Sequence, residues 1–217
     1  MKIILICVVI AAISYLLGSL NFGIIISKII QHDDVRSHGS GNAGTTNMMR
    51  NYGKTWGILT IIGDMAKVGV AIAIAYLIVK LTNQSDSINS VFGSNSDTII
   101  KSYSGIFCVM GHIFPCFFNF KGGKGVATCG GMCFIIDWRI ALILLAMFAV
   151  TVIITKYVSL GSIIMAVFYP VFMYVFHRSA VITIISLVFS VIVIVAHREN
   201  IKRLINHTEN KIGSSKK

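Results

Sequence analysis

Charged side chains are scarce in this chain. Of its 217 residues only 12% are charged, whereas 55% are hydrophobic, and the mean hydropathy is +0.81. Soluble domains carry roughly 25% charged residues, so this composition excludes an ordinary soluble domain. A helix needs about 20 apolar residues to cross a bilayer, so the length allows roughly six or seven spans and no separate soluble domain. The sequence therefore predicts an all-α integral membrane protein with a single transmembrane domain over 1–217.

Acidic residues and paired cysteines are also few. Eight acidic residues oppose nineteen basic ones, a net charge of +11, which in a membrane protein bears on topology, anionic lipid and anionic substrates before nucleic acid. The five cysteines are odd in number and show no CxxC spacing, which argues against a disulfide framework or a zinc site. The polar loops also offer too few carboxylates to hold a divalent ion. We expect no metal, no cofactor and no nucleic-acid partner.

Seven apolar segments predict a bundle of about seven transmembrane helices. They are 3–30, 56–80, 99–117, 126–136, 139–155, 159–176 and 180–196. The run Ile3–Leu17 could be a cleaved signal peptide, but hydrophobicity resumes over Phe22–Ile30 without an A-x-A site, which favours an uncleaved first span. The connector 81–98 is rich in serine and asparagine and lacks hydrophobic periodicity, so we expect it to be flexible.

Basic residues gather on one side of the predicted membrane. If the N-terminus lies outside, one face carries twelve basic residues and the other five. The first set is Arg36, Arg50, Lys54, Lys121, Lys124, Lys156, Arg198, Lys202, Arg203, Lys211, Lys216 and Lys217. The second set is Lys2, Lys80, Lys101, Arg139 and Arg178. The positive-inside rule places the first set, the unusual loops and the C-terminus in the cytoplasm.

A glycine-rich loop follows the first span. It reads HGSGNAGTTN over 38–47 and is followed by Arg50. Glycines let backbone N–H groups converge on an anion, hydroxyls add donors, and arginine supplies a forked cation suited to phosphate. The candidates are Gly39, Ser40, Gly41, Asn42, Gly44, Thr45, Thr46, Asn47 and Arg50. The alternative is a flexible polar linker. A nucleotide-binding P-loop is not supported, because only Gly53-Lys54-Thr55 matches that motif.

A second glycine-rich loop lies within GHIFPCFFNFKGGKGVA, residues 111–127. Pro115 breaks a helix, and the turn of Gly122, Gly123, Lys124 and Gly125 leads into the next one. Backbone donors and Lys124 would point at the start of that helix, whose dipole favours an anion. A positive-inside anchor would explain Lys124 but does not require the glycines.

The polar tail begins where the last apolar run stops. It reads HRENIKRLINHTENK over 197–211, and on a helix His197 and Asn200 share one face and could reach a substrate. The alternative is a basic helix lying against anionic lipid. Ser159 and Ser162, at the start of the sixth span, could cap a helix or bind phosphate on the same side as the loops.

Other polar residues have structural interpretations. Asp64 and Lys67 lie three apart inside the second span, where pairing is the cheapest way to bury either charge. His112, near a span end, is expected to be packed or hydrogen-bonded and not a base. Asp33 and Asp34 are expected to be solvated.

Three segments together closely resemble the bacterial acyl-phosphate:glycerol-3-phosphate acyltransferases, a family of membrane enzymes. They are GSGNAGTTNMMRNYGK at 39–54, GHIFPCFFNFKGGKGVAT at 111–128 and HRENIKRLINHTENKI at 197–212. Further matches at 18–23, 64–67 and 156–162 extend the resemblance over nearly the whole chain. The chain departs from the family pattern at Asn21 and Ala43, where proline is usual, and at Gly161, where serine is common.

The resemblance implies transfer of a fatty acyl group from acyl phosphate to the sn-1 hydroxyl of glycerol 3-phosphate. The products would be lysophosphatidic acid and phosphate, in the first acylation step of phospholipid biosynthesis at the bacterial inner membrane. A soluble enzyme that makes acyl phosphate from acyl carrier protein would be the functional partner. The resemblance assigns Ser40, Arg50, Lys124, His197 and Asn200 to binding or catalysis and gives Glu209 a structural role.

The residues supply a physical reason for this activity, since both substrates carry phosphate and the chain offers two glycine-rich donor loops. Acyl phosphate has a good leaving group, so no covalent nucleophile is required, and the proton would pass to His197 or to the substrate's own phosphate. The alternative function is an organic-anion or phosphate transporter, but transporters place charges near the midplane and usually show a repeat.

Overall fold

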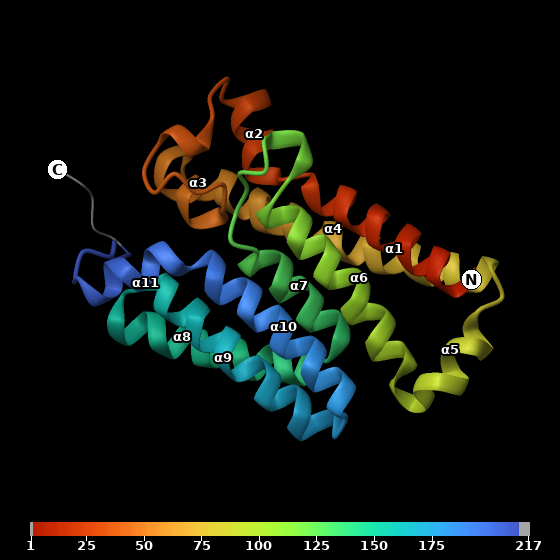
Figure 1. Cartoon of the computed structure of the whole chain (residues 1–217). Helices are drawn as coiled ribbons and strands as arrows, with labels where there is room; N and C mark the ends of the chain where they lie inside the picture. The colour runs from red at the N-terminus through yellow and green to blue at the C-terminus, as the bar shows by residue number, and fades with distance from the viewer. Residues whose placement is uncertain (1, 213–217) are drawn as a thin grey trace. The chain divides into compact units, whose positions relative to one another are not determined.

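The structure is a computed structural model that describes residues 2–212 (Figure 1). Within these residues the regular structure is helical throughout, with no strand. The chain divides into two compact units, with the boundary between Ile136 and Asp137. The single domain over 1–217 stays a prediction. Lys216 and Lys217, counted above on the basic face, lie outside the described residues.

The first unit is built on three long helices, with α1 packed against α4 and α6 and with α7 against α4 and α6 (Figure 1). Its elements are α1 (Lys2–Ser19), α2 (Phe22–Ile30), η1 (Val35–Ser37), α3 (Thr45–Tyr52), α4 (Lys54–Leu81), α5 (Ser85–Phe92), η2 (Gly93–Asn95), α6 (Ser96–Ile113), η3 (Cys116–Phe118) and α7 (Val126–Ile136). Gly18 and Gly111 set the spacing of α1 and α6, because a Cβ on either would overlap backbone of the other helix. Small residues thus let two membrane helices approach closely.

The first apolar segment is a broken helix, which the sequence did not predict. α1 ends at Ser19 and α2 begins at Phe22. The buried Asn21 stands at the break, and its Oδ1 accepts a hydrogen bond from the N–H of Ile24 at 3.2 Å. Asparagine is a strong N-cap residue, so Asn21 starts α2 at the position where proline is usual in the family it resembles.

Length and composition identify five or six candidate spans among the described residues, and the number of about seven stays a prediction. Within residues 2–212, five helical segments are long and apolar enough to cross a membrane, and α10 with α11, bent by 59° at their junction, gives a sixth if the pair counts as one span. All seven predicted segments are mainly helical, but α7 has only 11 residues. At 1.5 Å per residue it is about 16 Å long, too short for a hydrocarbon core of about 30 Å. The orientation in the membrane stays a prediction.

The connector 81–98 is more ordered than its composition predicts. It contains α5 and η2, so the expectation of a flexible segment was wrong. Ile88 of α5 packs against a buried cluster of Ile10, Ala75 and Val79. This contact docks a short helix whose composition is mostly polar.

The second unit is a helical layer in which α9 packs against both α8 and α10. Its helices are α8 (Trp138–Thr155), α9 (Val158–His177), α10 (Ala180–Ala196) and α11 (Arg198–Ile205). The polar tail after α11 folds back on this unit, since the N–H of Ile212 donates to the carbonyl of Lys156 at 2.9 Å. The turn between α8 and α9 and the tail therefore form one polar end of the unit.

Candidate functional site

The first glycine-rich loop is organised around one buried amide. The side chain of Asn47 donates through Nδ2 to the carbonyls of Val35, His38 and Asn42 at 2.9 to 3.0 Å, and its Oδ1 accepts from the N–H of Ser40 at 3.0 Å. Asn47 is 2% exposed. Its amide is therefore engaged in shaping the loop, and the substrate contact expected for it stays a prediction.

The glycines of this loop serve its backbone conformation. Gly39 and Gly41 have φ of +58° and +70°, a region that favours glycine. The N–H of Gly44 donates to the Oδ1 of Asn42 at 2.9 Å, which closes a turn just before α3 begins at Thr45. The loop is thus a fixed structure and not a flexible linker.

Several polar side chains around this loop are not used by the fold. Ser40, Thr46 and Arg50 are exposed, and among the described residues none of their side chains has a hydrogen-bond or ion-pair partner. The hydroxyl of Thr45 is buried and also has no partner there. The loop and the start of α3 therefore hold hydroxyl donors, and α3 adds one guanidinium, all available to a ligand.

The second glycine-rich loop caps the end of α6. The N–H of Gly122 donates to the carbonyl of Ile113, and that of Gly123 to the carbonyl of His112, each at 3.1 Å. The expectation that these two N–H groups would face an anion was therefore wrong, because they satisfy carbonyls that the end of a helix leaves open. Substrate contacts by Gly122, Gly123 and Gly125, like that by Lys124, stay predictions.

A buried ionic network lies under this loop. The Nζ of Lys67 lies 2.8 Å from the Oδ1 of Asp64 and 2.9 Å from the Nδ1 of His112, so the expected ion pair of α4 is present. It also donates to the carbonyls of Gly18 and Leu20, at 3.0 and 3.1 Å. Because an ammonium group only donates, Nδ1 of His112 accepts and the ring proton lies on Nε2. His112 is thus a packed, hydrogen-bonded residue, as the sequence predicted.

The structure joins the two glycine-rich loops through Arg36. Its guanidinium donates to the carbonyls of Phe118 and Lys121, at 2.8 and 2.9 Å. It also forms a two-point ion pair with Asp34, with N–O distances of 2.9 and 2.7 Å. These hydrogen bonds hold the pKa of Asp34 at about 2, against the opposing effect of burial. Sequence reasoning missed this contact, and the expectation that Asp34 is merely solvated was wrong.

Asp33 is likewise part of the loop structure. Its Oδ2 accepts from the hydroxyl of Tyr52 and pairs with the Nε2 of His38, each at 2.7 Å. The hydrogen bond from Tyr52 lowers the pKa of Asp33, and burial together with Asp33 raises the pKa of Tyr52 to about 12. Asp33 therefore ties the loop to the end of α3, which corrects its expected solvation.

In the second unit, Glu209 collects three hydrogen bonds. It accepts from the hydroxyl of Ser159 at 2.9 Å, from the Nδ2 of Asn200 at 2.7 Å and from the Nε of Arg203 at 2.8 Å. Burial opposes its ionisation, but these donors together hold the pKa of Glu209 below its usual value. Ser162 donates to the carbonyl of Val158 at 3.0 Å. The hydroxyls of Ser159 and Ser162 are thus engaged in the protein, and their phosphate contacts stay predictions.

His197 lies at the bend between α10 and α11. It is 2% exposed, and its Nδ1 is 2.8 Å from the carbonyl of Val193. A carbonyl only accepts, so Nδ1 carries the proton in the neutral ring and Nε2 is the nitrogen that can take one. Asn200 follows one turn later.

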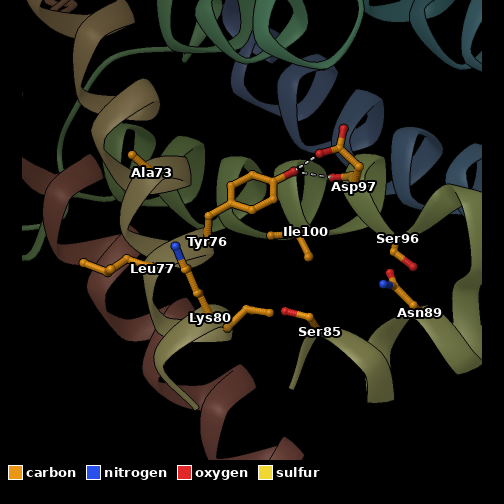
Figure 2. A pocket seen from close by; sticks show the side chains of 10 residues that line it. Ala73, Tyr76, Leu77, Lys80, Ser85, Asn89, Ser96, Asp97 and Ile100 are labelled. Carbon is orange, nitrogen blue, oxygen red and sulfur yellow. Dashed lines mark hydrogen bonds between the residues drawn. The ribbon is translucent and has the colours of Figure 1, made fainter. Parts of the chain in front are cut away.

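A separate pocket of about 680 Å³ lies between α4, α5 and α6 (Figure 2). Tyr76, Lys80, Ser85, Asn89 and Asp97 are among its lining residues, and the hydroxyl of Tyr76 hydrogen-bonds to Asp97. None of the residues predicted for phosphate binding or catalysis lines it. This pocket is therefore not the candidate site.

The comparisons with known proteins agree on one family. The family model described as glycerol-3-phosphate acyltransferase matches residues 8–207. The glycerol-3-phosphate acyltransferase of Clostridioides difficile (strain 630) is 40% identical over 210 residues, which cover 96% of this chain and 97% of that protein. The enzyme of the same name from Bacillus subtilis (strain 168) is 34% identical over 200 residues, covering 92% and 94%.

Two solved structures are similar over almost the whole chain. Both are crystal structures of PlsY (YgiH), described as an integral membrane glycerol 3-phosphate acyltransferase. The glycerol 3-phosphate form has a TM-score of 0.81 and 34% identity, and covers 95% of this chain and 96% of that one. The lysophosphatidic acid form has a TM-score of 0.78 and 33% identity, with 95% of each chain covered. With its long apolar helices, this chain is a multi-pass membrane enzyme and belongs to the glycerol-3-phosphate acyltransferase family that includes PlsY.

Proposed function

We propose that the acyl donor is acyl phosphate and that the products are lysophosphatidic acid and inorganic phosphate. The observation that carries this proposal is the pair of glycine-rich loops joined by Arg36, beside which Ser40 and Arg50 expose donors that the fold does not use. Both proposed substrates carry a phosphate, and an arginine guanidinium suits phosphate oxygens. The glycerol 3-phosphate and lysophosphatidic acid forms of PlsY support the same acceptor and product.

The reaction is an acyl transfer with a good leaving group. The sn-1 hydroxyl oxygen attacks the acyl carbonyl carbon, the bond from that carbon to the phosphate oxygen breaks, and phosphate leaves with its electron pair. Catalysis then consists mainly of positioning the hydroxyl and stabilising the developing oxyanion. No covalent acyl-enzyme is needed.

The proposed roles follow from the residue chemistry. Ser40, Arg50 and Lys124 bind phosphate oxygens, as hydroxyl and cationic donors. His197 or the leaving phosphate accepts the proton of the hydroxyl, and on His197 the accepting atom would be Nε2, because Nδ1 faces the carbonyl of Val193. Asn200, whose Nδ2 donates to Glu209, would contact substrate through its side-chain amide.

The membrane supplies part of the substrate affinity. Burying an acyl chain contributes about 0.8 kcal/mol per CH₂ group, so a site at the bilayer surface holds tail and phosphate together. We place the two loops at the cytoplasmic face of a bacterial inner membrane, since the basic residues favour that side. A soluble enzyme that makes acyl phosphate from acyl carrier protein would supply the donor.

The test is a reaction with purified protein, acyl phosphate and labelled glycerol 3-phosphate. Labelled lysophosphatidic acid formed without acyl-CoA or acyl carrier protein is the expected result. If product formed only with acyl-CoA, the proposal that acyl phosphate is the donor would be wrong. Uptake of label into liposomes without acylation would favour a transporter. The base is tested by His197→Asn beside His207→Asn, a matched change at an exposed histidine of the same segment. If both variants keep full kcat, His197 is not the base.

A further inference from the structure

We propose that Asp34 and Arg36 are positioning residues that latch the second glycine-rich loop against the first and thereby set the direction of Lys124. Neither residue touches the reacting atoms in this proposal. It rests on the proposed function in one respect, the binding of a substrate phosphate by Lys124.

The geometry of Arg36 supports a latch. Its Nε and Nη2 donate to the two carboxylate oxygens of Asp34 at 2.9 and 2.7 Å, while Nη1 donates to the carbonyls of Phe118 and Lys121 at 2.8 and 2.9 Å. The side chain is only 18% exposed. A two-point carboxylate pair fixes the plane of a guanidinium, so Asp34 aims the remaining N–H groups at the second loop.

The two carbonyls that Arg36 binds flank a strained turn. Asn119 and Phe120 lie between them, with φ of +57° and +56°. Asparagine tolerates this left-handed region, but a bulky residue such as phenylalanine adopts it only when its surroundings hold it there. Arg36 bridges the carbonyl before this pair and the carbonyl after it, so it closes the turn from outside.

The turn leads directly to Lys124. Gly122 and Gly123 follow Lys121, and their N–H groups dock on the carbonyls of Ile113 and His112 at 3.1 Å. A change in the turn would therefore move the backbone from which the Lys124 side chain extends. The latch thus acts on Lys124 through the two residues that separate it from Lys121, Gly122 and Gly123.

A second set of contacts shows that the turn rests on the first loop. Phe118 packs against the buried cluster that includes Val35 and Met48. The Nζ of Lys28 lies 5.9 Å from the centre of the Phe118 ring and 3.7 Å from the Oδ2 of Asp34. Apolar packing brings the turn to the loop, and the hydrogen bonds of Arg36 fix its orientation.

The chain contains a natural comparison for this ion pair. Arg139 binds Asp137 through the same atoms, with Nε at 3.0 Å and Nη2 at 2.7 Å, two residues apart as in the first pair. Its guanidinium lies over the Phe176 ring at 5.0 Å, and among the described residues it donates to no loop carbonyl. Arg139 therefore has the pair without the latch.

The experiment compares Arg36→Ala and Asp34→Asn with Arg139→Ala in the full-length protein. Hydrogen–deuterium exchange of the segment 116–125 reports the loop directly. We expect faster exchange at the N–H groups of Gly122 and Gly123 in the first two variants and no change in the third. Asp34→Asn keeps the proposal testable if Arg36→Ala fails to fold.

The second readout is steady-state kinetics with glycerol 3-phosphate. Misplacement of a binding group by about 1 Å can cost up to about 100-fold, so we expect kcat/KM to fall at least about tenfold in Arg36→Ala, mostly through KM. A merely structural role would lower the melting temperature and the active fraction and leave KM unchanged, and this result would overturn the proposal. Exchange and KM equal to those of Arg139→Ala would also overturn it. If the wild-type protein formed no lysophosphatidic acid, the proposed function would fail while the exchange result still decided the latch.

Discussion

The Nδ2 of Asn200 donates to the Oε1 of Glu209 at 2.7 Å, across nine positions of the polar tail. Glu209 is 7% exposed and also accepts from Ser159 and Arg203. Glu209→Gln places an N–H donor where three donors already point, so one of these contacts is lost. Hydrogen bonds to charged groups contribute about 1.5–3 kcal/mol each, so we expect a loss of about 1–3 kcal/mol in the free energy of unfolding, measured by thermal unfolding in detergent.

The matched control for this change is Glu199→Gln in the same segment. Glu199 is 56% exposed, and its partners Lys202 and Arg198 lie at 3.4 and 3.8 Å. Exposed pairs contribute about 0.2–1 kcal/mol, so this variant should be close to wild type. Equal losses in the two variants would contradict the structural role of Glu209.

Glu209 also predicts a dependence of stability on pH. The hydrogen bonds lower its folded-state pKa below the usual value of 4.5. The unfolded chain therefore binds a proton first, so this stabilisation is complete above about pH 4.5 and is lost as the pH falls through the folded-state pKa. We expect the difference in melting temperature between wild type and Glu209→Gln to shrink below pH 4.5. A difference that stays constant down to acidic pH would show that the carboxylate charge is not responsible.

The buried ion pair of α4 predicts that the effects of changing Asp64 and Lys67 on stability are strongly coupled. Asp64 and Lys67 are 0% and 4% exposed, so Asp64→Asn or Lys67→Met leaves a buried charge without its partner. Breaking a buried pair costs about 3–5 kcal/mol, whereas removing both charges avoids the unpaired ion. The double variant should therefore lose less stability than the two single losses added together, by about 0.5–3 kcal/mol.

Asp97→Asn serves as the control, because Asp97 is 59% exposed in its pair with Lys101. It should cost about 1 kcal/mol or less of unfolding free energy. Additive losses in the Asp64 and Lys67 variants, measured by thermal unfolding, would show that the two charges do not depend on each other.

The apolar segments of the fold could be predicted because bilayer spans have a strong composition signal. The break at Asn21 could not be predicted, because an asparagine within an apolar run is equally compatible with a buried polar residue and with a helix N-cap. The short helix α5 escaped prediction because the connector is rich in serine and asparagine, while its Ile88 packs against a cluster from α1 and α4. Such contacts depend on residues that are distant in the sequence.

In the site, too, some features could be predicted from the sequence and others could not. The motifs identified both glycine-rich loops, but the sequence predicted that the N–H groups of Gly122 and Gly123 would face an anion. In the structure their acceptors are backbone carbonyls of α6. Every residue has a backbone carbonyl, so the sequence does not show which carbonyl accepts a hydrogen bond. Arg36 was missed for the same reason, since it binds the carbonyls of Phe118 and Lys121. A side chain that binds backbone carbonyls can be recognised only when the fold shows which backbone segments lie next to it.

Gly123→Ala tests the fit of the second loop. A Cβ at this position would overlap the imidazole ring of His112, whose Nδ1 is held by Lys67. Overpacking of this kind costs about 1–3 kcal/mol, and the loop shift should also lower kcat/KM for glycerol 3-phosphate. Gly130→Ala on α7 is the control, because no atom of residues 2–212 counted as a neighbour lies within 4 Å of its added Cβ. That change should be neutral or stabilising by about 0.5–1 kcal/mol, and equal damage at both positions would contradict the fit.

Arg50→Ala tests the exposed cation of the first loop. Its side chain is exposed and has no partner among the described residues, so the melting temperature should not change. A charge-assisted hydrogen bond to phosphate contributes about 1.5–3 kcal/mol, so kcat/KM for glycerol 3-phosphate should fall about 10- to 100-fold.

Lys54→Ala is the control for Arg50→Ala, since Lys54 belongs to the same set of basic residues, is also exposed and has no partner among the described residues. If loss of any surface cation weakened recruitment of the anionic substrate, both variants would lose activity, and both losses would vanish as salt screens long-range attraction. A direct contact of Arg50 with phosphate is less screened. It predicts a loss in Arg50→Ala alone that persists at high ionic strength, and the same loss in both variants would remove Arg50 from the site.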